Sequence, residues 1–411
     1  MIPMNKKRLT LGIIIVLFFI SLLSAGYIGE KIKSIHRDDI LAGEIEVGDP
    51  NSEDLETIAE EEEKLPSNIE VTVTAVGDIM FHAPQIKGAY IPEKKEYDFN
   101  FSFEHVKKYI EAADLAIANF ETVTAGDEYG YRGYPMFNSP KSSIEALKNA
   151  GFDVLSTANN HSLDKGKKGI TNTIDNINEY GLKNVGTYKE PTDQIYIHDI
   201  KGIKAAILAY TYGVNGLESL LTPEELGYMV NIIREEKIKE DIAKAKENNV
   251  DVTIVCIHWG NEYQRQPSEF QTDLASKMFE WGADIILGSH PHVIQRSEMI
   301  EHNEDKKFII YSMGNFLSNQ RRETLSINNR NYTEDGVIVQ LTLEKDFSLG
   351  KTIVKDVDYI PTWVYRYGET GVQKHVILPT TEYLEGDSNS LSKEVMKKIQ
   401  ESYNNTIKQM N

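Results

Sequence analysis

Short apolar runs alternate with amphipathic stretches along most of the chain. The runs are rich in β-branched residues and predict strands at 71–76, 115–118, 154–157, 205–210, 252–257, 283–287, 308–312 and 337–343. Apolar residues at helical spacing predict helices over 103–113, 142–150, 169–180, 232–248 and 270–281. Gly151 and Gly181 end two of these helices. Strands that alternate with helices favour a layered α/β fold over an all-β sandwich or a helical bundle.

The N-terminus has the pattern of a membrane anchor. Residues 1–10 form a basic tail with Lys6, Lys7 and Arg8, and residues 11–28 form an apolar stretch without charge. That length is at the lower end of what spans a bilayer, and the basic flank is expected to stay in the cytoplasm. Small residues at 24–26 leave a cleaved signal peptide as the alternative, but the apolar run is long for a signal core. Either interpretation places the rest of the chain outside the cell.

Residues 29–68 predict an acidic linker. They include the run Glu60-Glu61-Glu62-Glu63 and few large apolar residues, so this segment cannot bury enough surface to offset its ordering entropy. A folded domain is predicted over 69–350. An extension over 351–411 is expected to complete it with an aromatic segment and to end in a helical tail.

Charge and cysteine content narrow the function classes. The formal net charge is −19, so the chain has no basic excess with which to neutralise the phosphates of a nucleic acid. The single cysteine, Cys256, excludes an internal disulfide, and its apolar neighbours favour a buried hydrophobic role.

Unusual polar side chains follow five of the predicted strands. In open α/β folds, ligands bind beyond the carboxyl ends of the strands. Imidazole, carboxylate and asparagine oxygen together suit a divalent cation such as Zn, Mn or Fe, and two such ions close together suit hydrolysis. The candidate metal ligands are Asp78, His82, Glu121, Asn160, His161, His258, His290 and His292.

Each candidate also has a plainer interpretation. Asp78 can stabilise the turn after Gly77, and His82 can pack beside its neighbours. Glu121 can be a solvated loop residue, and His258 a hydrogen-bonded core histidine. A pair of histidines on one turn, His290-Pro291-His292, can likewise be two surface residues. Clustering at successive strand ends favours the metal site.

Taken together, the strand-end motifs resemble those of the CapA/PgsA family over about 71–316. The motifs occur in the family's order and are Gly77-Asp78, Asn119-Phe120-Glu121, Asn160-His161, His258-Trp259-Gly260, Ser289-His290-Pro291-His292 and Ser312-Met313-Gly314-Asn315-Phe316. The family domain resembles calcineurin-like metallophosphoesterases. The resemblance therefore implies a four-layer α-β-β-α sandwich, with two sheets face to face and helices outside, behind an N-terminal transmembrane helix.

The resemblance also implies a role. Family members serve poly-γ-glutamate capsule synthesis and export in Gram-positive bacteria. The chain is then expected to be a single-pass protein of the cell membrane, with its main domain extracellular. Its expected partners are the membrane-bound polyglutamate synthetase complex and the poly-γ-glutamate polymer, with no nucleic acid.

The alternative is a two-metal hydrolase acting on a phosphoester or on the polymer's amide bonds. Glu121, Asn160 and His161 would then be its catalytic residues. The sequence departs from the phosphoesterase pattern at three points. The Asp-x-His spacing is missing after Asp78, Asn119-Phe120-Glu121 replaces the bridging aspartate motif, and Ser162 stands where an acidic residue often follows the Asn-His pair.

Overall fold

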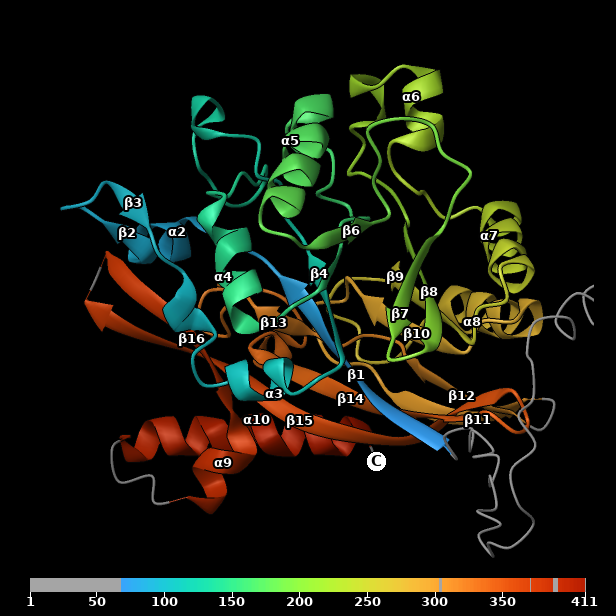
Figure 1. The fold of residues 1–411 in the computed structure, drawn as a ribbon. Coiled ribbons are helices and arrows are strands. Elements are labelled where there is room, and N and C mark those ends of the chain that lie inside the picture. The colour runs from blue at the N-terminus through green and yellow to red at the C-terminus, as the bar shows by residue number, and fades with distance from the viewer. Residues whose placement is uncertain (1–67, 303–304, 370, 387–390, 411) are drawn as a thin grey trace, which may run out of the picture. The chain divides into compact units, whose positions relative to one another are not determined.

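The computed structural model describes residues 68–302, 305–369, 371–386 and 391–410 (Figure 1). These residues all belong to one compact unit, so the C-terminal extension is part of the same unit as the preceding domain. The predicted basic tail 1–10, the anchor 11–28 and the linker 29–68, apart from Asn68, lie outside the described residues. Among the helices that the structure does describe, none combines the length and apolar character needed to cross a membrane.

Two β-sheets form the framework. The larger sheet has the order β16-β15-β14-β1-β4-β5-β6, with β13 paired to β1, and the smaller has the order β11-β12-β10-β9-β8-β7. The strands of the larger sheet are β1 (Asn68–Ile79), β4 (Leu115–Phe120), β5 (Val154–Ser156), β6 (Lys183–Val185), β13 (Asn315–Leu317), β14 (Asp335–Asp346), β15 (Lys351–Glu369) and β16 (Val372–Pro379). Those of the smaller sheet are β7 (Tyr196–Ile200), β8 (Ile203–Thr211), β9 (Val252–His258), β10 (Ile285–Ser289), β11 (Ser297–His302) and β12 (Asp305–Ile310). A separate short ribbon pairs β2 (Tyr90–Ile91) with β3 (Glu96–Tyr97).

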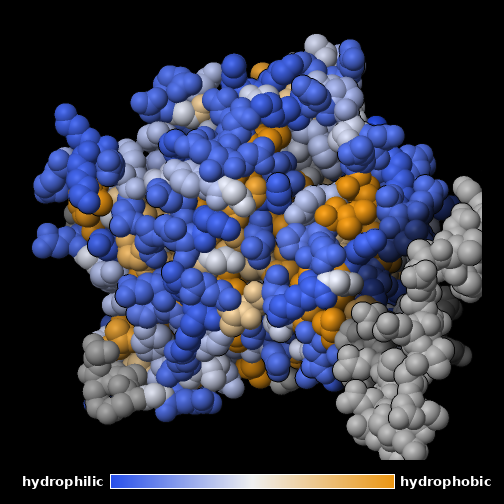
Figure 2. Space-filling view, viewed as in Figure 1, coloured by the Kyte–Doolittle hydropathy of each residue, from blue (hydrophilic) through white to orange (hydrophobic). Residues whose placement is uncertain are grey.

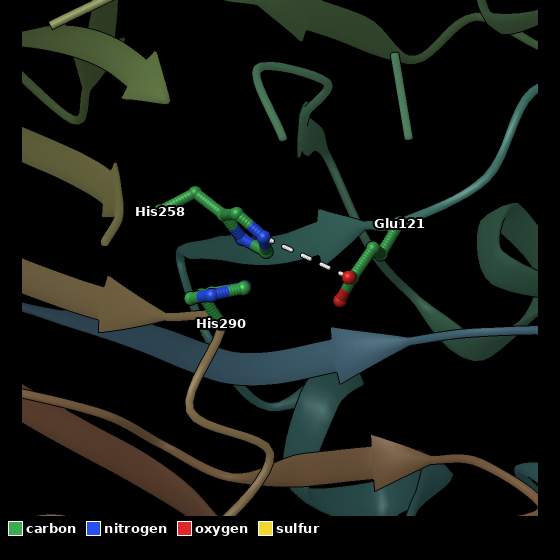
Figure 3. Close-up of side chains that lie close together, drawn as sticks. All are labelled: Glu121, His258 and His290. Atoms are coloured by element: carbon green, nitrogen blue, oxygen red, sulfur yellow. Dashed lines mark ion pairs between the residues drawn. The ribbon is translucent and has the colours of Figure 1, made fainter. Parts of the chain in front are cut away.

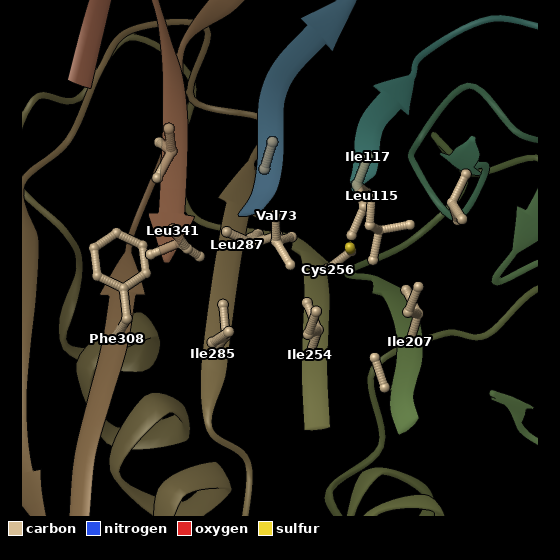
Figure 4. Packing of buried hydrophobic residues seen from close by; sticks show 14 of the residues in the cluster. Val73, Leu115, Ile117, Ile207, Ile254, Cys256, Ile285, Leu287, Phe308 and Leu341 are labelled. Carbon is tan, nitrogen blue, oxygen red and sulfur yellow. The ribbon is translucent and has the colours of Figure 1, made fainter. Parts of the chain in front are cut away.

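The main hydrophobic core lies between the two sheets (Figure 4). Val73 and Leu115 from the larger sheet pack in one cluster with Ile254 and Leu287 from the smaller sheet. Alternate residues of a strand face opposite sides of its sheet. The same strands therefore also contribute to outer cores, as Val76 does on the other face of β1.

Helices cover the outer face of each sheet. The helices are α2 (Ala83–Ala89), α3 (Lys107–Glu111), α4 (Ser142–Ala150), α5 (Gly166–Glu179), α6 (Pro223–Tyr228), α7 (Glu235–Glu247), α8 (Glu269–Trp281), α9 (Thr380–Glu385) and α10 (Lys393–Met410). Residues of α2, α3, α4 and α5 pack on the larger sheet, and residues of α7 and α8 pack on the smaller one. Ile399 of α10 packs against Trp363 of β15. The layer order is therefore helices, larger sheet, smaller sheet, helices.

Local sequence signals explain where several helices begin and end. Ser268 caps α8 by accepting a hydrogen bond from the backbone N–H of Gln271, which reciprocates through its side chain. Gly151 and Gly282 end α4 and α8 in the left-handed conformation that glycine adopts at little cost. These signals make the helix boundaries readable from the sequence.

The structure confirms the predicted mixed α/β fold but corrects some elements. The helix predicted over 103–113 is reduced to α3, preceded by a 3₁₀ turn at Asn100–Ser102. The strands at the sheet edges, β6, β16, β7 and β11, are not among those predicted from the sequence. The face of the molecule in Figure 2 is mostly hydrophilic with separate hydrophobic patches. This fits the burial of apolar residues between the two sheets and between the larger sheet and its helices.

Candidate metal centre

The predicted site residues lie at the carboxyl ends of strands from both sheets. Asp78 is near the end of β1, Glu121 directly follows β4, and His258 is the last residue of β9. His290 and His292 lie on the turn after β10. Because β1 and β4 run parallel, as do β9 and β10, these strand ends face the same region of the molecule. The structure therefore brings these five predicted site residues to one region.

The backbone around these residues is tightly packed. A Cβ on Gly288 would lie 2.0 Å from the carbonyl oxygen of Tyr311, so only glycine fits where β10 approaches its neighbour. His290 and His292 have φ angles of 98° and 57°, a left-handed conformation that non-glycine residues rarely adopt. Such strain persists only where the surrounding structure imposes it, and it is concentrated at functional sites.

Asp78 is the best-connected carboxylate of the cluster. Its side chain is fully buried and accepts hydrogen bonds from the Asn119 side-chain amide at 2.8 Å and from the backbone N–H of His290 at 3.3 Å. The Nδ1 atom of His292 lies 3.0 Å from Asp78 Oδ2 and 3.1 Å from Asn315 Oδ1. These contacts fix the position of the His292 ring.

Glu121 is also fully buried, but neither of its carboxylate oxygens has a hydrogen-bond partner. Two imidazole nitrogens lie near its Oε1 atom, His258 Nε2 at 3.6 Å and His292 Nε2 at 3.9 Å. The side chains of Glu121, His258 and His290 point toward one another (Figure 3). Their ligand atoms lie within 4.8 Å of one another, which is close enough to hold one ion.

The unpaired atoms test whether a metal ion fits here. A buried polar group without a partner costs about 1–3 kcal/mol, and more when it is charged. Four buried atoms of this cluster have no hydrogen-bond partner: both Glu121 oxygens, His290 Nδ1 and Asn119 Oδ1. Carboxylate oxygen and imidazole nitrogen are ligands for Zn, Mn or Fe. The residues present therefore fit a divalent cation, with Asp78, Glu121 and His292 forming a second group of the required spacing.

The electrostatics of the ion-free cluster follow from burial. Burial, reinforced by the charges of Asp78 and Glu262, raises the pKa of Glu121 well above its usual range. Burial and the neighbouring histidines hold the pKa of His258 and His290 well below the usual value. Burial alone would also lower the pKa of His292, but the hydrogen bond and charge of Asp78 outweigh it and raise that pKa. Neutral imidazole is the form that binds metal.

Asn160 and His161 lie beside the cluster. Asn160 Oδ1 is 3.0 Å from His258 Nε2, so it can orient that ring. His161 is buried, and its Nδ1 atom is 2.8 Å from Asp164 Oδ2. Asp164 also accepts a hydrogen bond from the backbone N–H of Phe137. This second contact fixes the carboxylate that orients the His161 ring.

His82 stands further apart from the other candidates. It is half-buried, and its Nδ1 atom lies 3.2 Å from Gln85 Oε1 at the start of α2. Among the described residues it belongs to none of the carboxylate and histidine groups spaced to hold an ion. It instead lines a cavity of about 330 Å³, together with His161 and His292.

Sequence reasoning missed Glu262 as a site residue. It is exposed on the loop after β9, lines the same cavity, and forms a third group of ion-holding spacing with His290 and His292. Its place four residues after His258 was the only available signal. Tyr263 follows it, and its backbone N–H donates to the carbonyl of Pro291 at 2.7 Å, which ties this loop to the histidine turn.

Comparison with known proteins identifies the family. The family described as "Bacterial capsule synthesis protein PGA_cap" matches residues 72–320, which include every member of the cluster. The chain belongs to this family. The resemblance to CapA/PgsA that the motifs indicated is thus confirmed.

Two named relatives are also similar over much of the chain. "Capsule biosynthesis protein CapA" of Bacillus anthracis is 34% identical over 265 residues, which are 62% of this chain and 61% of that protein. The aligned part of the chain therefore spans less than two thirds of that relative. "PGA biosynthesis protein CapA" of Bacillus subtilis (strain 168) is 29% identical over 294 residues, 70% of this chain and 71% of that protein.

Solved structures show a weaker similarity. A calcineurin-like phosphoesterase, YfkN from Bacillus subtilis, aligns with a TM-score of 0.43 and 17% identity over 83% of this chain and 98% of that one. A phosphatase from Mycoplasma pneumoniae aligns with a TM-score of 0.43 and 16% identity over 79% of this chain and 99% of that one.

Proposed function

We propose that this chain is a membrane-anchored extracellular component of poly-γ-glutamate capsule synthesis and export, and that it works with a divalent metal ion. The observation that supports a metal-dependent role most directly is the unpaired, fully buried carboxylate of Glu121 beside His258 and His290. Family membership and the printed names of the two CapA relatives support the capsule role. The apolar stretch 11–28 supports the anchor.

Each side chain of the cluster has a distinct task in this proposal. Asp78, Glu121, His258, His290 and His292 would hold the metal. Asn119 and the backbone N–H of His290 hold Asp78 in place, and Asn160 holds His258. Such supporting contacts fix the orientation of ligands and commonly change metal affinity by about 10–100-fold. The bound ion would supply Lewis-acid polarisation of an oxygen and activation of water.

The partners follow from the same proposal. The chain would act beside a membrane-bound polyglutamate synthetase complex and contact the polymer as it leaves the cell. The chain contains no Gly-x-x-x-x-Gly-Lys-Ser/Thr phosphate-binding motif, so it would not itself be the ATP-dependent ligase.

A gene deletion in the chain's own host tests the capsule role. Deletion is expected to abolish surface γ-linked glutamate polymer, measured by acid hydrolysis and amino-acid analysis of washed cells. A plasmid copy of the wild type should restore the polymer, and a copy carrying His258→Ala and His290→Ala should not. An unchanged amount of polymer in the deletion strain would disprove the capsule role.

A metal-dependent hydrolase is the second candidate. The cavity of about 330 Å³ supports it, because His161, Glu262 and His292 all line a space that could admit a substrate beside the metal ligands. Purified, metal-loaded protein should then release phosphate from a phosphomonoester, or new amino groups from poly-γ-glutamate, and His292→Ala should abolish that release. If the wild type loaded with Zn, Mn or Fe releases neither product, this candidate fails.

A further inference from the structure

A second cavity of about 520 Å³ lies between α10 and the segments that leave the metal centre. It is lined by three cationic side chains, Arg265, Arg296 and Lys408, and none of its described lining residues is acidic. We call it the basic pocket. A concentration of positive charge is unusual in a chain with a net charge of −19, and it creates a local field of the opposite sign.

Two of these cations are not neutralised by an ion pair among the described residues. Within the part of the chain that the structure describes, neither Arg265 nor Lys408 forms an ion pair with a carboxylate. Arg265 is half-buried, and its guanidinium lies 3.9 Å from the ring centroid of Tyr332. Arg296 is paired with Glu298, but its side chain is still 38% exposed.

Arg265 is held in place by α10. Its Nη2 atom donates to the backbone oxygen of Asn405 at 2.9 Å and to Gln409 Oε1 at 2.8 Å. Gln409 donates back to the backbone oxygen of Arg265 at 3.1 Å. A guanidinium fixed in this way loses less conformational entropy when it binds an anion, and its planar fork suits carboxylates.

The basic pocket is connected to the metal centre through two segments of backbone. Residues 262–266 run from Glu262 and Tyr263, which line the metal-side cavity, to Arg265 and Gln266, which line the basic pocket. The second segment, residues 292–296, runs from His292, which lines the metal-side cavity, to Arg296, which lines the basic pocket. Gln295 joins it to the first segment, since its side-chain amide donates to the backbone oxygens of Gln264 at 2.8 Å and Gln266 at 3.2 Å.

We propose that the basic pocket binds the carboxylates of an anionic polypeptide chain and guides that chain toward the metal centre. The identity of the polymer, poly-γ-glutamate, rests on the proposed function. A single carboxylate in contact with one exposed cation binds weakly, but a polymer presents a carboxylate on every residue and can contact all three cations at once. This arrangement also explains how a strongly acidic protein can contact a polyanion.

Binding of labelled poly-γ-glutamate tests the inference. The full chain in detergent micelles is titrated against fluorescein-labelled polymer of defined length, and anisotropy gives the dissociation constant. Replacing Arg296→Gln and Lys408→Gln together should raise the dissociation constant by about fivefold for each charge removed. Added salt should weaken wild-type binding, because exposed charges are screened.

The matched control is Arg234→Gln with Lys239→Gln, which removes the same charge from exposed positions at and near α7. It should bind as the wild type does. Equal affinity of the basic-pocket variant and the control would overturn the inference, as would a wild type that does not bind the polymer.

Vesicles containing phosphatidylglycerol provide the other arm of the test. If the basic-pocket variant loses binding to the vesicles but keeps binding to the polymer, the ligand is an anionic lipid and the inference is wrong. The gene-deletion experiment is independent of this titration. A deletion strain without polymer, combined with a basic-pocket variant of normal affinity, would refute the basic pocket and leave the capsule role standing.

Discussion

Replacing Glu121 with glutamine should separate a metal ligand from a structural carboxylate. Glu121 is fully buried and neither of its oxygens accepts a hydrogen bond, and the neighbouring Asp78 carboxylate can accept one from a glutamine amide as it would from protonated Glu121. Glutamine has nearly the same shape and no charge. We therefore expect Glu121→Gln to leave the stability of the ion-free protein within about 1 kcal/mol of the wild type, or to increase it. The same change should greatly weaken metal binding.

The size of the effect follows from linkage. Free metal at 100 times its dissociation constant stabilises the wild type by about 2.7 kcal/mol. If the substitution weakens metal binding by about 100-fold, the remaining stabilisation is about 0.4 kcal/mol. Unfolding entropy is about 2.1 cal/mol/K per residue, or roughly 0.7 kcal/mol/K for about 340 residues. The lost stabilisation of about 2.3 kcal/mol therefore corresponds to a melting temperature about 3 °C lower in saturating metal.

Differential scanning calorimetry measures both halves of this prediction. Wild type and Glu121→Gln are melted in chelator and then with Zn²⁺, Mn²⁺ or Fe²⁺, beside Glu240→Gln as an exposed control on α7. The wild type and the control should gain about 2.7 kcal/mol with one of the metals, and Glu121→Gln should gain only about 0.4 kcal/mol. A wild type that gains no stability from any of the three, or a Glu121→Gln variant with the full gain, would refute the assignment of Glu121 as a ligand.

Three further predictions concern the surrounding structure. Gly288→Ala should lower stability and metal content together, because the new Cβ would meet the carbonyl of Tyr311; a normal metal content by elemental analysis would contradict this. Glu334→Gln should cost about 1.5–3 kcal/mol in urea unfolding, since it removes the charged acceptor at 3.1 Å from buried Arg321 and at 3.0 Å from half-buried Arg322; a change under about 0.5 kcal/mol would contradict it. Burial raises the pKa of Asp335 from 3.8 to about 7, so the folded state keeps a proton that the unfolded state loses, and wild-type stability should fall as pH rises from about 4 to about 7. Asp335→Asn should remove up to about 4 kcal/mol of this fall, and identical urea midpoints against pH for both proteins would contradict it.

The hydrophobic pattern was sufficient for the buried elements and insufficient for the edges. β9 and β10 lie inside the smaller sheet, and their near-continuous apolar runs identified them. β7 has four residues that are only partly buried or exposed, so its sequence lacks a run. The helix predicted over 103–113 has the right apolar spacing, but part of that segment forms turns that bury Phe103 and Val106 instead. Tertiary packing overrode local propensity there.

The residues of the site could be predicted from the sequence, but the contacts between them could not. Parallel strands end at one edge of a sheet, so strand-end histidines and carboxylates could be grouped from the sequence. The sequence could not show that His82 lies at Gln85 while Glu262 lies with His290 and His292, because both outcomes depend on loop conformation. It also could not show that Glu121 would lack a hydrogen-bond partner, which is a property of the packed structure alone.

The two cavities explain why charge is distributed unevenly in this acidic chain. Among the described residues that line the metal-side cavity, Glu262 is the acidic one and none is a lysine or arginine, so a polyanion finds no permanently charged cation there before a metal ion is present. The basic pocket has three cations and lies along the same backbone segment. A bound divalent ion would add positive charge to the first cavity, whereas the cations of the basic pocket do not depend on metal. Binding of the polymer should therefore depend on metal only at the metal centre, so that chelator weakens the contact there and leaves the contribution of Arg296 and Lys408 unchanged.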